Sequence, residues 1–179
     1  TVVVDSASTL NPIVEDHVCF ENGQVSNLRK VKGLKTGEAA VARDWRRITD
    51  GLDYLRNEKN MAVIVVGHTK VKNHKNPEGD DYHVYDLDIG MDGVPELPKR
   101  WADVILFANT KVVVKKDGED STFSKAKRVA KDVTGGQRLL FTKATPPHPG
   151  GGRDVYGHLP YEMPLDWVIF EQAVADALS

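Results

Sequence analysis

An acid and a hydroxyl side chain follow the first apolar run of the chain, where they could act on a bound phosphate. Thr1-Val2-Val3-Val4 is uninterrupted and β-branched, and Asp5 and Ser6 come directly after it. Such a run predicts a strand buried on both faces, as in the centre of a parallel sheet, where ligands bind beyond the carboxyl ends of the strands. An acid at that point can help to hold the Mg²⁺ of a bound nucleotide, so Asp5 and Ser6 are candidate nucleotide- and Mg²⁺-binding residues. The alternative is a strand end at which Asp5 caps the next helix.

A histidine occupies the same kind of position after a second apolar run. Residues 61 to 66 are continuously apolar, and Gly67-His68-Thr69-Lys70 follows them. An amphipathic helix is predicted between the two runs, which makes a strand–helix–strand unit with parallel strands. Asp5 and His68 then lie at the same edge of the sheet. His68 is the candidate catalytic residue, able to sense a terminal phosphate and to pass that state to the loop beyond; the alternative is a histidine satisfied by backbone groups.

Two predicted loops carry local positive charge, although the formal net charge of the chain is −2. They span residues 22 to 37 and 71 to 94. Their basic residues, with the one that precedes the second loop, are candidate contacts to the phosphate backbone of a nucleic acid: Arg29, Lys30, Lys32, Lys35, Lys70, Lys72 and Lys75. A solvated surface is the alternative for both loops. The second loop also holds Asp86 and Asp88, which could bind a cation or simply face water.

Three features of the sequence argue against other kinds of site. Cys19 is the single cysteine, which excludes an internal disulfide and a Cys-cluster metal site and is typical of a reducing compartment. Gly33-Leu34-Lys35-Thr36 is similar to the end of a phosphate-binding loop, but G-x-x-x-x-G-K-[ST] needs a glycine before the lysine and a strand before the loop. Thr36 better suits the cap of the next helix. Gly150-Gly151-Gly152 lacks the G-x-G-x-x-G spacing and is predicted to be a loop.

The clearest predicted element is a helix over residues 37 to 59. Its apolar residues recur every three or four positions and predict a stripe that packs into a core: Val41, Trp45, Ile48, Leu52 and Leu55. Charged residues are expected on the opposite face: Arg43, Asp44, Arg46, Arg47, Asp50 and Asp53.

The remaining segments predict a mixed α/β fold with hairpins added to a parallel core. Helices are expected at residues 12 to 20 (capped by Ser8 or Thr9, with Pro12 in the first turn), 97 to 101 and 165 to 178. The last helix is capped by Asp166 and has one apolar stripe: Trp167, Phe170, Val174 and Leu178. Strands are expected at residues 104 to 108 and 138 to 142, with a turn at residues 116 to 119. A length of 179 residues suits one domain.

Neither a signal peptide nor an apolar run of membrane-spanning length is present in the sequence. We therefore expect a cytoplasmic protein without a membrane partner. The chain begins at Thr1 inside what is predicted to be a central strand, so we also expect a fragment or a chain whose N-terminal part is missing.

Several motifs of the chain occur in a characteristic order. Val2-Val3-Val4-Asp5-Ser6 resembles a Walker B strand, and Val66-Gly67-His68-Thr69-Lys70-Val71-Lys72 resembles a sensor strand with its following loop. Further segments fit the same order: Asp50-Gly51-Leu52-Asp53-Tyr54-Leu55-Arg56, Pro77-Glu78-Gly79, Tyr85-Asp86-Leu87-Asp88, Trp101-Ala102-Asp103-Val104-Ile105-Leu106-Phe107-Ala108, Tyr156-Gly157-His158-Leu159-Pro160 and Pro164-Leu165-Asp166-Trp167. Together they resemble phage-encoded RecA-like P-loop ATPases, the AAA-domain nucleotide-binding proteins tied to phage recombination and single-strand annealing.

This resemblance implies a RecA-like core with a central, mainly parallel sheet, forming one domain over residues 1 to 179 that lacks the N-terminal Walker A part. It implies ATP and Mg²⁺ as cofactors, both conditional on that part, with Asp5 supporting Mg²⁺ and His68 reading the phosphate state. It implies that residues 22 to 37 and 70 to 93 face single-stranded DNA. Because RecA-like ATPases commonly build sites between subunits, it also implies a homo-oligomer, in the cytoplasm of a bacterial host.

Three functions are therefore open. The first is an ATP-dependent protein of DNA recombination, single-strand annealing or repair, of which the 179 residues alone should neither bind ATP tightly nor hydrolyse it. The second is a truncated, catalytically inactive RecA-like module that binds DNA or another subunit. The third is a metallophosphoesterase, suggested by Gly67-His68-Thr69. That class needs clusters for two metals, whereas this chain has no Asn-His-Asp cluster and its six histidines are scattered.

Overall fold

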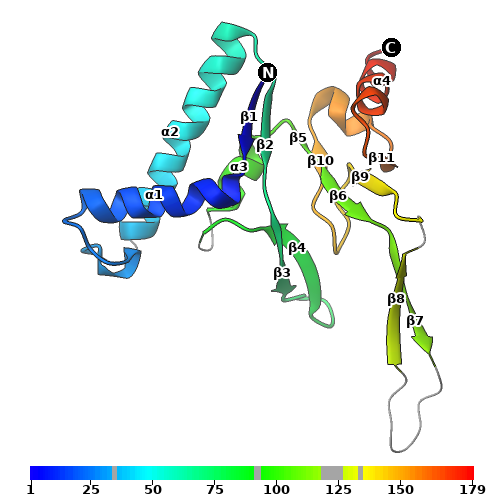
Figure 1. Cartoon of the computed structure of the whole chain (residues 1–179), viewed down its shortest axis with the longest axis horizontal. Helices are drawn as coiled ribbons and strands as arrows, with labels where there is room; N and C mark the ends of the chain where they lie inside the picture. Colours follow the sequence, from blue (N-terminus) through cyan, green and yellow to red (C-terminus); the bar gives the residue numbers. More distant parts are fainter. Residues whose placement is uncertain (34–35, 91–93, 118–126, 133–134) are drawn as a thin grey trace, which may run out of the picture. The chain divides into compact units, whose positions relative to one another are not determined.

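The computed structural model describes residues 1–33, 36–90, 94–117, 127–132 and 135–179. These form two compact units, Thr1–Ala102 and Asp103–Ser179, whose elements are labelled in Figure 1. The division into units leaves the expected single domain over residues 1 to 179 as a prediction.

The first unit combines a pair of strands, a β-hairpin and three α-helices. In chain order its elements are β1 (Val2–Asp5), α1 (Ala7–Glu21), the short 3₁₀ helix η1 (Leu28–Lys30), α2 (Thr36–Lys59), β2 (Val63–Val66), β3 (Thr69–His74), β4 (Tyr82–Leu87) and α3 (Glu96–Trp101).

The strands β1 and β2 pair in parallel, which confirms the predicted strand–helix–strand unit. Their register runs from Val2 opposite Val63 to Asp5 opposite Val66, and they lie side by side in Figure 1. The predicted central, mainly parallel sheet is not seen: across the described ranges this is the one parallel pair, and the other ladders are antiparallel.

Only one face of β1 is covered by the described part of the chain. Val2 and Val4 are half-buried, whereas Val3 is 54% exposed and Asp5 is exposed as well. The expectation of a strand buried on both faces was therefore wrong for the described residues. A run of β-branched residues favours an extended backbone, but it does not determine which other elements cover each face of the strand.

The helices α1 and α2 pack through an apolar core that contains one buried polar contact. The indole Nε1 of Trp45, which is 2% exposed, donates to Asn11 Oδ1 at 2.9 Å. Asn11 in turn donates from Nδ2 to Glu15 Oε1 at 2.6 Å. Because a buried amide or indole is costly without partners, this chain of bonds specifies how α1 crosses α2.

The stripe predicted on α2 is the buried one, but the buried arc is wider than the pattern indicated. Val41, Trp45 and Leu52 belong to the buried set as expected. Asp44, predicted on the charged face, is 7% exposed. Its carboxylate lies 3.5 Å from Arg47 Nη1, and His17 Nε2 of α1 is 4.0 Å away. Since α1 packs beside the stripe, it also covers this carboxylate, and the guanidinium groups of Arg43 and Arg47, 3.7 and 3.5 Å away, offset the loss of water.

The first helix begins five residues earlier than predicted. It starts at Ala7, so Pro12 lies inside the helix instead of its first turn. It ends as expected, with Asn22 as C-cap and Gly23 at a φ of 89°, a conformation that favours glycine.

Residues 71 to 94, predicted to form a long polar loop, contain most of a β-hairpin instead. The strands β3 and β4 pair in antiparallel register from Thr69 opposite Leu87 to His74 opposite Tyr82. The prediction failed because most residues of β3 are exposed, so the strand lacks the apolar alternation by which a half-buried strand is recognised.

The second unit is built from short antiparallel strands and a C-terminal helix. In chain order its elements are β5 (Val104–Ile105), β6 (Phe107–Thr110), β7 (Val112–Asp117), β8 (Lys127–Asp132), β9 (Arg138–Phe141), β10 (Gly151–Gly152), the 3₁₀ helix η2 (Asp154–His158), β11 (Glu162–Pro164) and α4 (Trp167–Leu178). The strand β9 lies between β6 and β11. One buried apolar cluster of this unit consists of Leu140, Leu159, Met163 and Phe170.

The glycine run is used for close backbone approach. Gly151 and Gly152 form β10, which pairs with β5, where a loop was predicted. A Cβ added at Gly152 would lie 2.5 Å from the carbonyl carbon and oxygen of Tyr156. Any side chain at position 152 would therefore displace η2 from this strand pair.

The helix α4 is capped as predicted but only partly buried. Asp166 Oδ1 accepts hydrogen bonds from the amides of Val168 and Ile169 at 2.9 and 3.1 Å. Phe170 packs into the core, whereas Trp167 and Leu178 are 56% and 72% exposed, so half of the predicted stripe was wrong. Among the described residues, no helix combines the length and apolar content that crossing a membrane requires.

The side chain of His148 packs against two phenylalanine rings of the second unit, one on β6 and one on β9. The imidazole of His148 has its centroid 5.1 Å from that of Phe107 and 4.8 Å from that of Phe141. Partial burial beside these rings lowers the pKa of His148 below its ordinary 6.5, because the apolar surroundings disfavour the imidazolium.

This lowered pKa predicts acid sensitivity of the second unit. Above about pH 6.5 the imidazole is neutral in both the folded and the unfolded chain. As the pH falls below that value the unfolded chain takes up the proton first, so stability present at neutral pH is lost. We expect His148→Phe to reduce this loss, measured as the change in denaturant midpoint between about pH 7.5 and about pH 5.5. If His148→Phe loses as much stability between the two pH values as the parent, His148 is not the cause of the acid sensitivity.

Candidate nucleotide site and the neighbouring hairpin

The parallel register brings the predicted acid and the predicted histidine to one edge of the strand pair. Asp5 ends β1 opposite Val66, the last residue of β2, and His68 follows two residues later. The peptide bond between Asp5 and Ser6 is cis. From this edge one segment continues into α1 and the other into the hairpin.

Helix capping at this edge is done by Ser6, not by Asp5. The Ser6 hydroxyl accepts a hydrogen bond from the Thr9 amide at 3.2 Å and lies 3.1 Å from Thr9 Oγ1, and Ser6 is 5% exposed. This corrects both capping expectations, Asp5 and Ser8 or Thr9. The exposed Asp5 carboxylate has no hydrogen bond or ion pair within the described ranges, so it has no structural role there.

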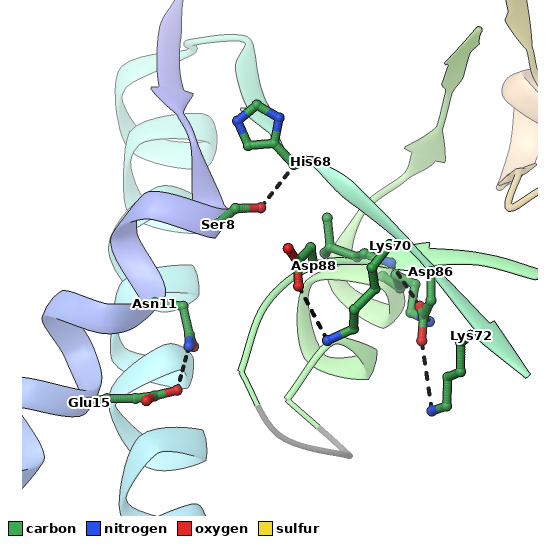
Figure 2. Close-up of polar contacts among 10 residues, drawn as sticks. Ser8, Asn11, Glu15, His68, Lys70, Lys72, Asp86 and Asp88 are labelled. Atoms are coloured by element: carbon green, nitrogen blue, oxygen red, sulfur yellow. Dashed lines mark hydrogen bonds and ion pairs between the residues drawn. The ribbon is translucent and has the colours of Figure 1, made fainter. Parts of the chain in front are cut away.

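His68 is held by its backbone and leaves its ring exposed. Its amide donates to Ser8 Oγ at 3.0 Å, and its carbonyl accepts from the Asp88 amide at 2.8 Å. Figure 2 shows the imidazole directed away from Lys70 and Lys72 of the hairpin. An exposed imidazole with a fixed backbone can approach a ligand at this edge without rearranging the fold.

Two of the predicted DNA-contacting lysines are engaged by carboxylates. Lys70 Nζ lies 3.3 Å from Asp88 Oδ1, and Lys72 Nζ lies 3.9 Å from Asp86 Oδ2 (Figure 2). Asp86 and Asp88 thus serve as partners of lysines, and no group of three or more metal-ligating side chains occurs among residues the structure describes.

The ion pairs extend from the hairpin to α3 through Lys99. Lys99 Nζ lies 2.9 Å from Asp86 Oδ1 and 2.5 Å from Glu96 Oε1. Burial alone would raise the pKa of Asp86, but the hydrogen bond and charge of Lys99 outweigh it and hold the pKa below its ordinary value. Burial likewise opposes the charge of Lys99, but its bonds to Glu96 and Asp86 raise its pKa. Lys99 therefore anchors the hairpin to α3.

The remaining predicted contacts are exposed cations. Arg29 and Lys30 lie in η1, Lys32 follows it, and Lys75 lies just beyond β3. In the part of the chain that the structure describes, none of these four has an ion-pair partner. Lys35 lies outside the described residues.

Arg29 also borders a cavity of about 480 Å³ between α1 and the segment before η1. Acidic and polar groups line it together with apolar ones: Glu15, Asp16, Cys19, Val25, Ser26, Asn27 and Leu28. This cavity could not be predicted from the sequence, because it forms only where α1 and the segment before η1 pack together.

Ser8 is the residue of this site that the sequence did not reveal as a site residue. It was considered only as a helix cap, and its observed partner lies 60 positions away. A serine in the first turn of a helix is so commonly a local cap that no local signal distinguishes this long-range bond.

The parallel register thus places an exposed acid at the end of β1 and a histidine two residues beyond the end of β2, and in P-loop NTPases an acid at a strand end helps to hold the Mg²⁺ of the bound nucleotide. A family model described as an AAA domain matches residues 1–153, and the chain belongs to that family. Membership indicates a nucleotide-binding, ATPase-like protein of the P-loop NTPase class that depends on a nucleotide and Mg²⁺. No curated protein and no solved structure matches the chain.

The Lys99–Asp86 contact predicts how the hairpin is anchored. Lys99→Met should destabilise the first unit by roughly 1–3 kcal/mol at neutral pH, because it leaves a mostly buried carboxylate without its closest cation. The loss should shrink as the pH falls below about 3.8, since a carboxylate with a lowered pKa stabilises the fold above its unfolded pKa and ceases to do so once protonated. Urea titrations across this pH range measure both effects, and Lys75→Met, which removes an exposed cation just beyond β3, is the matched control. A pH-independent loss in Lys99→Met would contradict the assignment.

Proposed function

We propose that this chain supplies the Mg²⁺-supporting and phosphate-sensing part of a RecA-like ATPase that couples ATP hydrolysis to single-stranded DNA binding. The observation that carries the proposal is the exposed Asp5 carboxylate at the carboxyl end of β1, relieved of helix capping by Ser6 and aligned with the strand that leads to His68. The phage origin and the roles in recombination, single-strand annealing or repair, in a bacterial cytoplasm, follow from the motif resemblance and belong to the proposal.

Each residue of the edge would have a distinct task. Asp5 would support the Mg²⁺ that accompanies the nucleotide, directly or through a water molecule, and Mg²⁺ would neutralise charge on the transferring phosphate. His68 would contact the terminal phosphate with its ring. Ser6, predicted to bind nucleotide, would act by fixing the first turn of α1, because its hydroxyl is already engaged there.

Phosphate binding also needs a loop that surrounds the phosphates with backbone amides and a lysine. Residues 1 to 179 contain no G-x-x-x-x-G-K-[ST] motif. The site proposed here is therefore the part that holds Mg²⁺ and senses phosphate, and it works together with such a loop.

This division of tasks predicts a strong effect of Asp5. In the full-length gene product, Asp5→Ala should lower ATP hydrolysis at least about 100-fold, because several kcal/mol of charge stabilisation by Mg²⁺ would be lost. Asp16→Ala, which removes an exposed carboxylate from α1, is the matched control and should leave the rate unchanged. Residues 1 to 179 on their own should hydrolyse no ATP; a clear rate from them that Asp5→Ala abolishes would overturn the proposal.

Single-stranded DNA is the proposed polymer because exposed, unpaired cations lie in the segment after α1. Within the described ranges Arg29, Lys30 and Lys32 have no carboxylate partner, so each can neutralise a phosphate without first leaving one. Lys70 and Lys72 would have to leave Asp88 and Asp86 to do so. Lys75, just beyond β3, is a further exposed cation proposed to contact DNA, and Lys35, which lies outside the described residues, stays a prediction. The homo-oligomer that the motif resemblance implies also belongs to the proposal.

The difference between free and paired cations can be measured. Replacing Arg29, Lys30 and Lys32 by Gln should reduce the slope of log affinity against log salt for single-stranded DNA by about 2, since each phosphate contact contributes about 0.7. The double variant Lys70→Gln, Lys72→Gln is the comparison and should change the slope much less. An unchanged slope in the triple variant would remove η1 from the DNA surface and favour the alternative of a subunit-binding module.

A further inference from the structure

We propose that Ser8 is a positioning residue for His68, so that the first turn of α1 sets the place of the phosphate-sensing side chain. The significance of this link for nucleotide sensing rests on the proposed function. The link itself is a property of the fold and can be tested without a nucleotide.

The backbone of His68 is bonded on both sides to other elements. Its amide donates to Ser8 Oγ of α1 at 3.0 Å, and its carbonyl accepts from the Asp88 amide, directly after β4, at 2.8 Å. Figure 2 shows the bond between Ser8 and His68 as a dashed line. Because both the backbone N–H and the backbone C=O of His68 are hydrogen-bonded, the residue is not a free strand end.

The neighbouring glycine shows how closely these elements approach. A Cβ added at Gly67 would overlap Leu87 Cδ1 and would come to 4.0 Å from Ser8 Oγ. The end of β4 therefore approaches Gly67 very closely, and the first turn of α1 is near by. Because Gly67 and His68 contact both α1 and the end of β4, we expect a displacement of α1 to move them.

The turn that carries Ser8 begins directly after the proposed Mg²⁺-supporting acid. Ser6 binds Thr9 through its hydroxyl and the Thr9 amide, so the turn is internally braced. A movement of the Asp5–Ser6 backbone on Mg²⁺ binding would therefore carry Ser8, and with it the His68 amide, as one body.

The link continues from His68 into the hairpin through Asp88. The same residue donates its amide to His68 and pairs its carboxylate with Lys70 at 3.3 Å. Ser8, His68, Asp88 and Lys70 thus form a continuous series of polar contacts from α1 to β3, and these residues come from three separate segments of the chain.

Three variants separate this role from a general effect on the helix. Ser8→Ala removes the acceptor, Ser8→Thr keeps it, and Thr9→Ala removes a hydroxyl from the same turn without touching His68. In residues 1 to 179, hydrogen exchange of the His68 amide, followed by NMR, should accelerate about 2- to 12-fold in Ser8→Ala, as expected for loss of one hydrogen bond. Ser8→Thr and Thr9→Ala should behave as the parent. Equal exchange in Ser8→Ala and Thr9→Ala, or no rescue by Ser8→Thr, would overturn the proposal.

Kinetics of the full-length gene product then test the role in sensing. Ser8→Ala should lower kcat for ATP by a similar factor with little change in KM, because the ring of His68 is displaced while nucleotide binding through the phosphate loop is retained. Ser8→Thr should restore kcat. If exchange at His68 changes as expected but the parent shows no nucleotide-dependent activity, the Ser8 link stands and the proposed function fails. If the parent is active and kcat is unchanged in Ser8→Ala, the positioning role fails.

Discussion

The parallel register of β1 and β2 is the constraint on which the first unit depends. Hydrogen bonding aligns Asp5 with Val66, so both strands deliver their next residues to the same edge. A slip of one residue would turn Asp5 from the exposed face to the covered one, because neighbouring side chains of a strand point to opposite faces. The helices α1 and α2 connect the two strands, and the bond from Trp45 to Asn11 fixes how α2 packs on α1. A shifted register would disturb this helix packing.

The polar groups at that edge show a division between structure and chemistry. Ser6 and Ser8 are both engaged by backbone amides, one within α1 and one across to His68. Within the described part of the chain, the Asp5 carboxylate and the His68 ring at this edge make no hydrogen bond or ion pair. A fold that satisfies its own helix and strand ends with hydroxyls can keep a carboxylate and an imidazole available for a ligand.

The elements that the sequence predicted well are those whose signal is local. The stripe of α2, the parallel order of β1 and β2 and the Asp166 cap all follow from spacing or from the residue next to a helix. The expectations that failed depended on what lies opposite. The exposure of Val3 and the burial of Asp44 are set by neighbouring elements, and β3 carries too little apolar alternation to be recognised.

In the candidate site, too, some features could be predicted from local sequence and others depend on contacts between distant segments. Asp5 and His68 were predicted to lie together because the carboxyl ends of two parallel strands meet at one edge of a sheet. This rule depends only on the order and direction of the strands. The bond from His68 to Ser8 spans 60 positions, and the pairing of Lys70 and Lys72 with Asp88 and Asp86 depends on a hairpin that was not foreseen. Lys35 and the end of the turn predicted at residues 116 to 119 fall outside the described residues.

The paired lysines of the hairpin have a consequence for ion stoichiometry. A lysine that exchanges an aspartate for a phosphate releases a counterion from the polymer, but the aspartate left behind attracts a cation from solution. The two events nearly cancel, so such an exchange conserves bound ions, unlike the one-sided release that an unpaired cation causes. An exchange of this kind at Lys70 and Lys72 would therefore add almost nothing to the salt sensitivity of binding to a polyanion.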